Sequence, residues 1–108
     1  PVGCTASHAT LDYILKNKIV DSIKEKEILF RKLLKHKKIK SISGKGLMLS
    51  LDLHDNNETV RIVESCMNDG LLLFYFLFND ASIRITPPLT ITTEDIKKGC
   101  KILLENLD

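Results

Sequence analysis

LLLFYFLFNDASIRITPPLTITTEDI, residues 71–96, predicts two strands, the turn that joins them and the start of a helix. Residues 71–78 are an unbroken apolar run, which predicts a strand covered by the chain's own helices on one face and by something else on the other. In residues 82–86 isoleucines alternate with polar side chains, as in a half-buried strand. Because only a short turn at Asn79 and Asp80 separates the two strands, they must be antiparallel.

The second half of the stretch predicts where the sheet stops and the helix begins. The double proline at 87–88 lacks the N–H groups that a β-ladder needs, so pairing should end there and Arg84 should lie near the end of its strand. Thr92, followed three residues later by Asp95, matches a helix N-cap. A helix is therefore predicted from about Thr93.

Apolar periodicity assigns most of the remaining chain. Helices are predicted over 4–16, 19–37 and 56–70, and alternation over 39–53, interrupted by glycines, predicts a strand pair or one bent strand. The residues expected on apolar faces are Leu47, Leu49, Leu51 and Leu53 in the strands, Val60, Val63 and Met67 in the third helix, and Ile96, Cys100, Leu103 and Leu107 in the last. The predicted class is α+β, a small antiparallel sheet of three to four strands with helices packed on it, in one domain over residues 1–108.

The composition is that of an ordinary globular domain. A net charge of +2 is too small to imply a polyanionic partner by itself. No apolar run approaches the ~20 residues of a membrane span and no signal peptide is visible, which predicts a cytoplasmic protein. Cys4, Cys66 and Cys100 are odd in number and widely spaced, which predicts reduced core thiols and no zinc site.

No self-sufficient active site is visible in the sequence. Gly44-Lys45-Gly46 lacks the third glycine of a phosphate loop and leads into a strand. His8, His36 and His54 have no partner at ligand spacing, and no serine or cysteine grouping suggests a nucleophile. No catalytic and no metal-binding residue is therefore assigned.

Two basic features remain as candidates for ligand binding. In residues 31–40 six basic side chains surround His36; they could form an anion or nucleic-acid patch, or simply a solvated helix end. Arg84 could bind a carboxylate at the sheet rim, because a guanidinium offers two parallel donors to its two oxygens. It could equally form a structural salt bridge or be a solvated strand-end arginine, and the pattern alone does not decide between these.

Four segments carry a resemblance to a known family. They are PVGCTASHATLDYI at 1–14, SGKGLMLSLDL at 43–53, DGLLL at 69–73 and IRITPPLTITTEDI at 83–96. In order and spacing they resemble the C-terminal small domain of class III aminotransferases, fold-type I enzymes that use pyridoxal phosphate. The resemblance covers essentially the whole chain, and it departs at Ser43, where the family often has arginine.

The resemblance implies a role for Arg84 and a reaction for the parent enzyme. In that family the arginine before the double proline binds a substrate carboxylate, which implies that role for Arg84. The implied reaction moves an amino group between an amino acid of the acetylornithine, ornithine or lysine type and 2-oxoglutarate. The lysine and contacts that hold pyridoxal phosphate belong to a large domain absent from this chain, so no cofactor-binding residue is assigned and the chain alone is expected to be inactive. Its implied partners are that domain, a second subunit of a homodimer, and small amino and oxo acids, with no membrane and no nucleic acid.

The alternative hypothesis is a free-standing α+β interaction or regulatory module whose basic helix end binds an acidic partner or RNA. The apolar strand predicted at 71–78 favours the enzyme, since a lone module would leave its second face uncovered.

Overall fold

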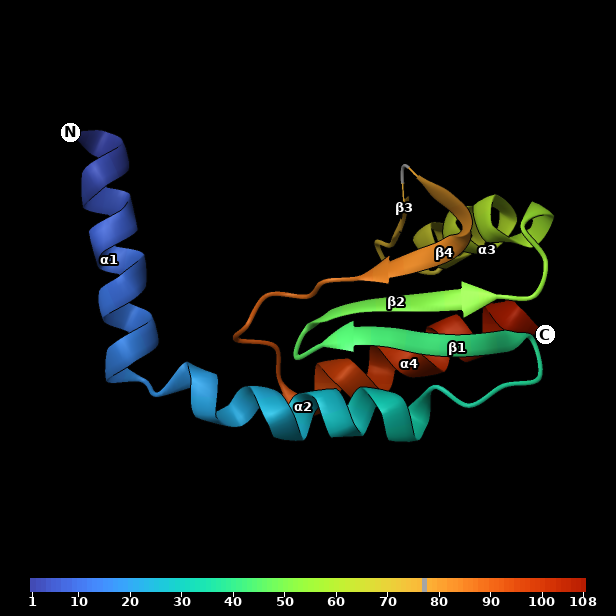
Figure 1. The fold of residues 1–108 in the computed structure, drawn as a ribbon, viewed down its shortest axis with the longest axis horizontal. Helices are drawn as coiled ribbons and strands as arrows, with labels where there is room; N and C mark the ends of the chain where they lie inside the picture. Colours follow the sequence, from blue (N-terminus) through green and yellow to red (C-terminus); the bar gives the residue numbers. More distant parts are fainter. Residues whose placement is uncertain (77) are drawn as a thin grey trace.

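A computed structural model describes residues 1–76 and 78–108 of the chain. Its elements follow in the order α1 (Val2–Lys16), α2 (Ile19–Leu33), β1 (Ile39–Lys45), β2 (Met48–Leu53), α3 (Asn57–Asn68), β3 (Phe74–Phe76), β4 (Asn79–Ile85) and α4 (Thr93–Leu107) (Figure 1). The strands form one antiparallel sheet in the order β1-β2-β4-β3. The predicted α+β class, an antiparallel sheet with helices packed on it, is confirmed.

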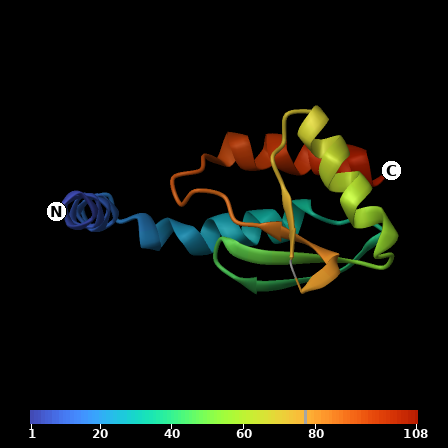
Figure 2. The same ribbon diagram turned by 90° about the horizontal axis from the view of Figure 1, so that it is seen from above.

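The hydrophobic core lies between one face of this sheet and the helices. Figure 2 shows α3 and α4 on the same side of the sheet. The strand and last-helix positions predicted to be apolar are all buried, namely Leu47, Leu49, Leu51, Leu53, Ile96, Cys100, Leu103 and Leu107. Burial of one large aliphatic side chain stabilises a fold by about 1.5–3 kcal/mol, so these contacts are the main source of stability.

The start of α4 agrees with the sequence prediction. Thr92 Oγ1 accepts a hydrogen bond from the backbone N–H of Asp95 at 3.1 Å and donates one to Asp95 Oδ2 at 2.7 Å. This satisfies a free amide of the first helical turn and places a carboxylate near the positive end of the helix dipole. The cap thereby fixes the start of α4 at Thr93.

Residues 39–53 form a strand pair, and the hairpin is bound to α2. Gly44 has φ +99°, and a Cβ there would lie 2.1 Å from the carbonyl oxygen of Met48, so only glycine fits. Glu27 of α2 accepts a hydrogen bond from the backbone N–H of Gly46 at 2.6 Å. This bond, assisted by Arg31, holds the pKa of Glu27 below its usual value. The guanidinium of Arg31 also donates to two backbone carbonyls of β1, which fixes the hairpin against the helix.

The strand predicted over 71–78 is too long, because β3 covers Phe74–Phe76. Leu77, inside the predicted strand, lies outside the described residues. The N–H groups of Gly70 and Leu71 bond to the carbonyls of Met67 and Cys66, which closes the end of α3 in a Schellman motif. Leu71 is therefore used by the helix cap and cannot start a strand.

Two helix predictions also need correction. α2 ends at Leu33 and not near residue 37, because the basic side chains that follow repel each other at helical spacing and the chain must turn into β1. The buried face of α3 is Thr59, Ile62, Val63 and Cys66. Val60 and Met67, predicted to be apolar contacts, are each 50% exposed. The buried face of α3 begins with a threonine, which is not apolar, so apolar periodicity alone did not identify this face.

Helix α1 differs from the others because none of its residues is buried. It projects from the body of the molecule (Figure 1). The prediction of core thiols is wrong for Cys4, which is exposed on α1, and confirmed for Cys66 and Cys100, where burial raises the pKa of each thiol to about 11. In the described part of the chain, no helix combines the length and apolarity that crossing a membrane requires.

Candidate carboxylate-binding site

Strand β4 places Arg84 at the rim of the sheet, as the sequence predicted. It is the next-to-last residue of the strand and is exposed, whereas its neighbours Ile83 and Ile85 point into the core. Pro87 and Pro88 then take the chain away from the sheet before α4 begins. Arg84 thus faces away from the helices, on the open face of the sheet.

A cross-strand row of side chains surrounds Arg84 on this open face. The strand register pairs Arg84 with Ser50 of β2 on one side and with Phe74 of β3 on the other, and it pairs Ser50 with Ser43 of β1. Residues directly opposite each other in adjacent strands project from the same face. The row therefore presents one cation, two hydroxyls and one aromatic ring.

The guanidinium of Arg84 is held by an aromatic ring and not by an acid. Its Cζ atom lies over the ring of Phe74, 5.4 Å from the ring centroid, within the range of a cation–π interaction. Within residues 1–76 and 78–108, the ion pairs and side-chain hydrogen bonds do not include Arg84. A structural salt bridge, one of the alternatives for this residue, therefore finds no partner in these residues.

A pocket of about 360 Å³ opens beside Arg84, between the end of β4, the start of β3 and helices α2 and α4. Most of its wall is apolar, and the charged side chains that line it are those of Arg84 and Asp95. Asp95 is committed to the cap of α4 through Thr92. Arg84 is the cation among the lining residues, and because its side chain projects from the open face, an anionic ligand would reach the guanidinium from that face, at the rim of the pocket.

A second polar cluster on the open face centres on Asp52 of β2. Ser41, Ser50 and Ser82, one from each of three adjacent strands, donate hydrogen bonds of 2.7–2.8 Å to its carboxylate. Partial burial alone would raise the pKa of Asp52, but the hydroxyls of Ser82, Ser41 and Ser50 outweigh it, so this pKa lies below its usual value. This cluster was not predicted from the sequence; along each strand its polar residues alternate with the leucines and isoleucines of the other face.

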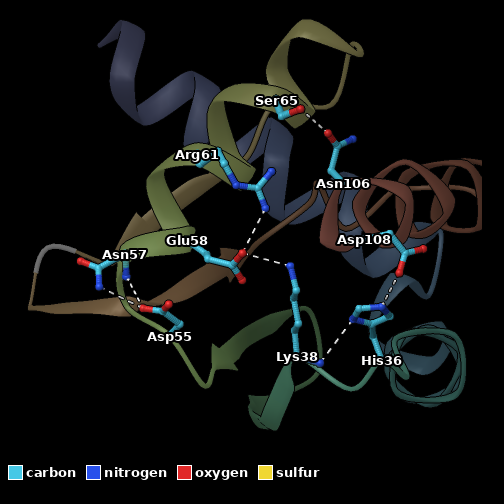
Figure 3. Close-up of polar contacts among 9 residues, drawn as sticks. All are labelled: His36, Lys38, Asp55, Asn57, Glu58, Arg61, Ser65, Asn106 and Asp108. Carbon is cyan, nitrogen blue, oxygen red and sulfur yellow. Dashed lines mark hydrogen bonds and ion pairs between the residues drawn. The ribbon is translucent and has the colours of Figure 1, made fainter.

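The basic stretch 31–40 is partly used for internal contacts. His36 pairs with Asp108 at 2.9 Å, and Lys38 with Glu58 at 3.0 Å (Figure 3). These bonds lower the pKa of both carboxyls, and they join the segment before β1 to the end of α4 and the start of α3. The remaining lysines, Lys32, Lys35, Lys37 and Lys40, are exposed. Exposed lysines of this kind are typical of a solvated surface, and the described part of this stretch contains no aromatic platform for bases.

The described residues contain no cluster that could hold a metal ion, and none of the lysines is buried. In residues 1–76 and 78–108 no group of three histidine, cysteine or acidic side chains lies close enough to hold a metal ion. An imine-forming lysine needs a buried position that lowers its pKa, and every lysine of this chain is exposed or only partly buried. Among the described residues, the side chains around Arg84 are therefore hydroxyls, aromatic rings and aliphatic groups, with no buried lysine beside them.

Comparisons with known proteins identify the family of this chain. The family model described as "Aminotransferase class-III" matches residues 1–107. The acetylornithine aminotransferase of Caldanaerobacter subterraneus subsp. tengcongensis is 36% identical over 110 residues, which cover 95% of this chain and 27% of that protein. Ornithine aminotransferase 2 of Staphylococcus aureus is 35% identical over 100 residues, which cover 89% of this chain and 24% of that protein. The chain therefore spans about a quarter of the length of these relatives, at 27% and 24%.

Solved structures of aminotransferases share this fold. The crystal structure of an acetylornithine aminotransferase from Elizabethkingia anophelis matches with a TM-score of 0.87 and 25% identity, over 98% of this chain and 29% of that one. The match covers nearly all of this chain, so it includes most of the projecting helix α1.

Proposed function

Because this chain belongs to the class III aminotransferase family, we propose that it is the C-terminal small domain of a pyridoxal-phosphate-dependent aminotransferase in which Arg84 binds a substrate carboxylate. The single observation that carries this proposal is the exposed guanidinium beside an apolar pocket, with no acidic partner in residues 1–76 and 78–108. A bound carboxylate would receive two parallel N–H bonds from it. These bonds would fix the orientation of the substrate relative to the rest of the site.

The substrate class follows from the named relatives and from the charge of the site. We propose that the enzyme moves an amino group between an amino acid of the acetylornithine, ornithine or lysine type and 2-oxoglutarate. Acetylornithine and ornithine aminotransferases are among the proteins it resembles. A dicarboxylic oxo acid suits a site whose available charge is a guanidinium.

The cofactor belongs to the rest of the parent enzyme. Pyridoxal phosphate supplies the electron sink for amino-group transfer when it is bound. The exposed or partly exposed lysines of this chain do not suit its attachment, so the chain alone is expected to be inactive. We assign the exposed apolar side chains of α1, such as Leu11 and Leu15, to contact with the large domain or with the second subunit of a homodimer. The buried, protonated thiols of Cys66 and Cys100 suit a reducing compartment such as the cytoplasm.

The decisive experiment substitutes Arg84 by alanine and by lysine in the full-length enzyme. A charge-assisted hydrogen bond contributes about 1.5–3 kcal/mol, so Arg84→Ala should lower kcat/KM for a dicarboxylic oxo acid by roughly tenfold to a few hundredfold. Arg84→Lys should recover only part of this, because an ammonium lacks the two-pronged donor geometry. The absorbance spectrum of the bound cofactor should remain near that of the wild type.

Arg61→Ala is the matched control, since Arg61 is also exposed and, within residues 1–76 and 78–108, its ion pair is with Glu58 on its own helix. It should leave kcat/KM within about twofold, as surface substitutions usually do. Unchanged activity in both Arg84 variants would overturn the carboxylate role. The coding sequence upstream of Pro1 tests the domain assignment, which predicts a large domain with a lysine positioned for the cofactor.

A further inference from the structure

Phe74 has a defined relation to the candidate carboxylate-binding arginine. It lies directly opposite Arg84 in the register of β3 and β4, on the same face of the sheet. The Arg84 Cζ atom lies over its ring, 5.4 Å from the centroid. We propose that Phe74 is a positioning residue, whose ring holds the guanidinium in the orientation that receives the substrate carboxylate. This inference rests on the proposed function of Arg84.

Cation–π contact and carboxylate binding use different parts of the guanidinium. Its five N–H donors lie in one plane and point outward from the edges, so a carboxylate binds at an edge. The Arg84 Cζ atom lies over the ring of Phe74, and a guanidinium that stacks with its face on a ring keeps all its edge donors free. One guanidinium can therefore contact the ring and a carboxylate at the same time.

An arginine in this place needs such support. Its side chain is long and flexible, and the described acidic side chains make no ion pair with it that would fix its direction. A side chain that is already oriented loses less conformational freedom when a ligand binds. The contact with Phe74 provides that orientation from the adjacent strand.

The orientation of the Arg84 side chain matters because two pockets lie beside it. Arg84 and Phe74 line the pocket of about 360 Å³ beside α4, and both also line a second one of about 410 Å³ formed with Tyr75, Phe76 and Phe78. Both residues therefore border both pockets. Without the ring, the guanidinium would be free to turn away from the first pocket, and a carboxylate at the rim of that pocket would form hydrogen bonds with it less readily.

Packing is not the main role of Phe74. Its side chain is 49% exposed and is not part of the hydrophobic core, so its loss should cost little stability. Tyr75 is the matched control, because it is the next residue of the same strand, is equally 49% exposed, and pairs with Ile83 and not with Arg84. A general effect of losing an aromatic ring from β3 would appear in both positions.

The test measures steady-state kinetics of the full-length enzyme with 2-oxoglutarate as the amino acceptor. An exposed cation–π contact contributes about 0.5–1 kcal/mol, so Phe74→Leu should raise KM about two- to fivefold with kcat nearly unchanged. Phe74→Tyr should keep the wild-type KM, because its ring also attracts a cation. Tyr75→Leu should leave KM within about 1.5-fold of wild type.

A double-mutant cycle separates positioning from packing. If Phe74 acts through Arg84, then adding Phe74→Leu to Arg84→Ala should cause no further rise in KM. Additive effects in the double variant would overturn the proposal, as would equal effects of Phe74→Leu and Tyr75→Leu. Phe74→Met, which keeps the volume without the ring, replaces the leucine variant if that protein is poorly folded.

The outcomes distinguish this proposal from the function on which it rests. Loss of activity in Arg84→Ala, together with a wild-type KM in Phe74→Leu, refutes the positioning role alone. Unchanged kinetics in Arg84→Ala refutes the carboxylate role and the positioning role together.

Discussion

The two faces of the sheet differ most clearly at Leu51 and Asp52, consecutive residues of β2. Leu51 is fully buried in the core between the sheet and the helices. Asp52 faces the other way, where three serine hydroxyls hold its carboxylate in place. One step along the strand therefore changes the environment from a packed aliphatic core to an open polar surface.

The difference suggests that stability and function are divided between the faces. The helix-covered face buries the large aliphatic side chains, which are the main source of folding free energy. The open face carries Arg84, Phe74 and the Asp52 cluster, which bury little apolar surface but are already arranged for contact with another surface or ligand. Substitutions on the open face should therefore alter function without unfolding the chain.

The largest expected effect tests the covered face. Leu51→Ala deletes a fully buried side chain and should lower the free energy of unfolding by about 2–5 kcal/mol, which urea denaturation measures. Met48→Ala removes a side chain of similar size from the same strand, but Met48 is 73% exposed on the open face. It should change stability by less than about 0.5 kcal/mol. Equal losses in both variants would mean that the open face is packed as well, and the comparison would fail.

A smaller effect is expected at the helix that covers the core. Thr92→Ala removes the hydroxyl that accepts from the N–H of Asp95, and loss of an N-cap costs about 1 kcal/mol. Thr93→Ala is the control, because it changes the same residue type one position later, inside the first turn. It should leave stability unchanged or slightly raised, since alanine has the higher helix propensity. Similar losses in both threonine variants would rule out a capping role for Thr92.

Much of the covered face could be predicted from sequence, because it depends on short patterns. Alternation at 47–53 and 82–86 placed the buried leucines and isoleucines, and Thr92 with Asp95 placed the start of α4. The errors occurred where a contact distant in sequence or a cap overrides the pattern. The Schellman closure of α3 takes Leu71 out of the predicted strand.

The open face was less predictable, because its groups meet only through strand register. Arg84 was expected near a strand end, and it lies there. Its contact with Phe74 depends on how β3 pairs with β4, which includes an irregular step between Tyr75 and Phe76. The Asp52 cluster likewise needs three strands in one register, and no local pattern in the sequence reports that register.

The smallest expected effect concerns acid stability on the open face. The pKa of Asp52 is lowered in the folded chain, so its carboxylate contributes to stability. This contribution is fully present above the unfolded-state pKa of about 3.9. It is lost as the pH falls through the folded-state pKa. Because the group is only partly buried, this contribution should be below about 1 kcal/mol. Asp52→Asn should lower stability at neutral pH by this amount and remove the corresponding part of the acid-induced loss.

The titration of the Asp52 carboxyl carbon, followed by NMR, measures the same contribution without unfolding the chain. Ser41→Ala removes one hydroxyl donor, at 2.7 Å, and should raise the pKa of Asp52 toward its ordinary value. Met48→Ala, on the same face but without a bond to Asp52, should leave that pKa where it is. A pKa for Asp52 at or above the ordinary value in the unmodified chain would show that burial outweighs the serine hydroxyls. The open face would then be a destabilising surface, and the proposed division of stability and function between the two faces would have to be redrawn.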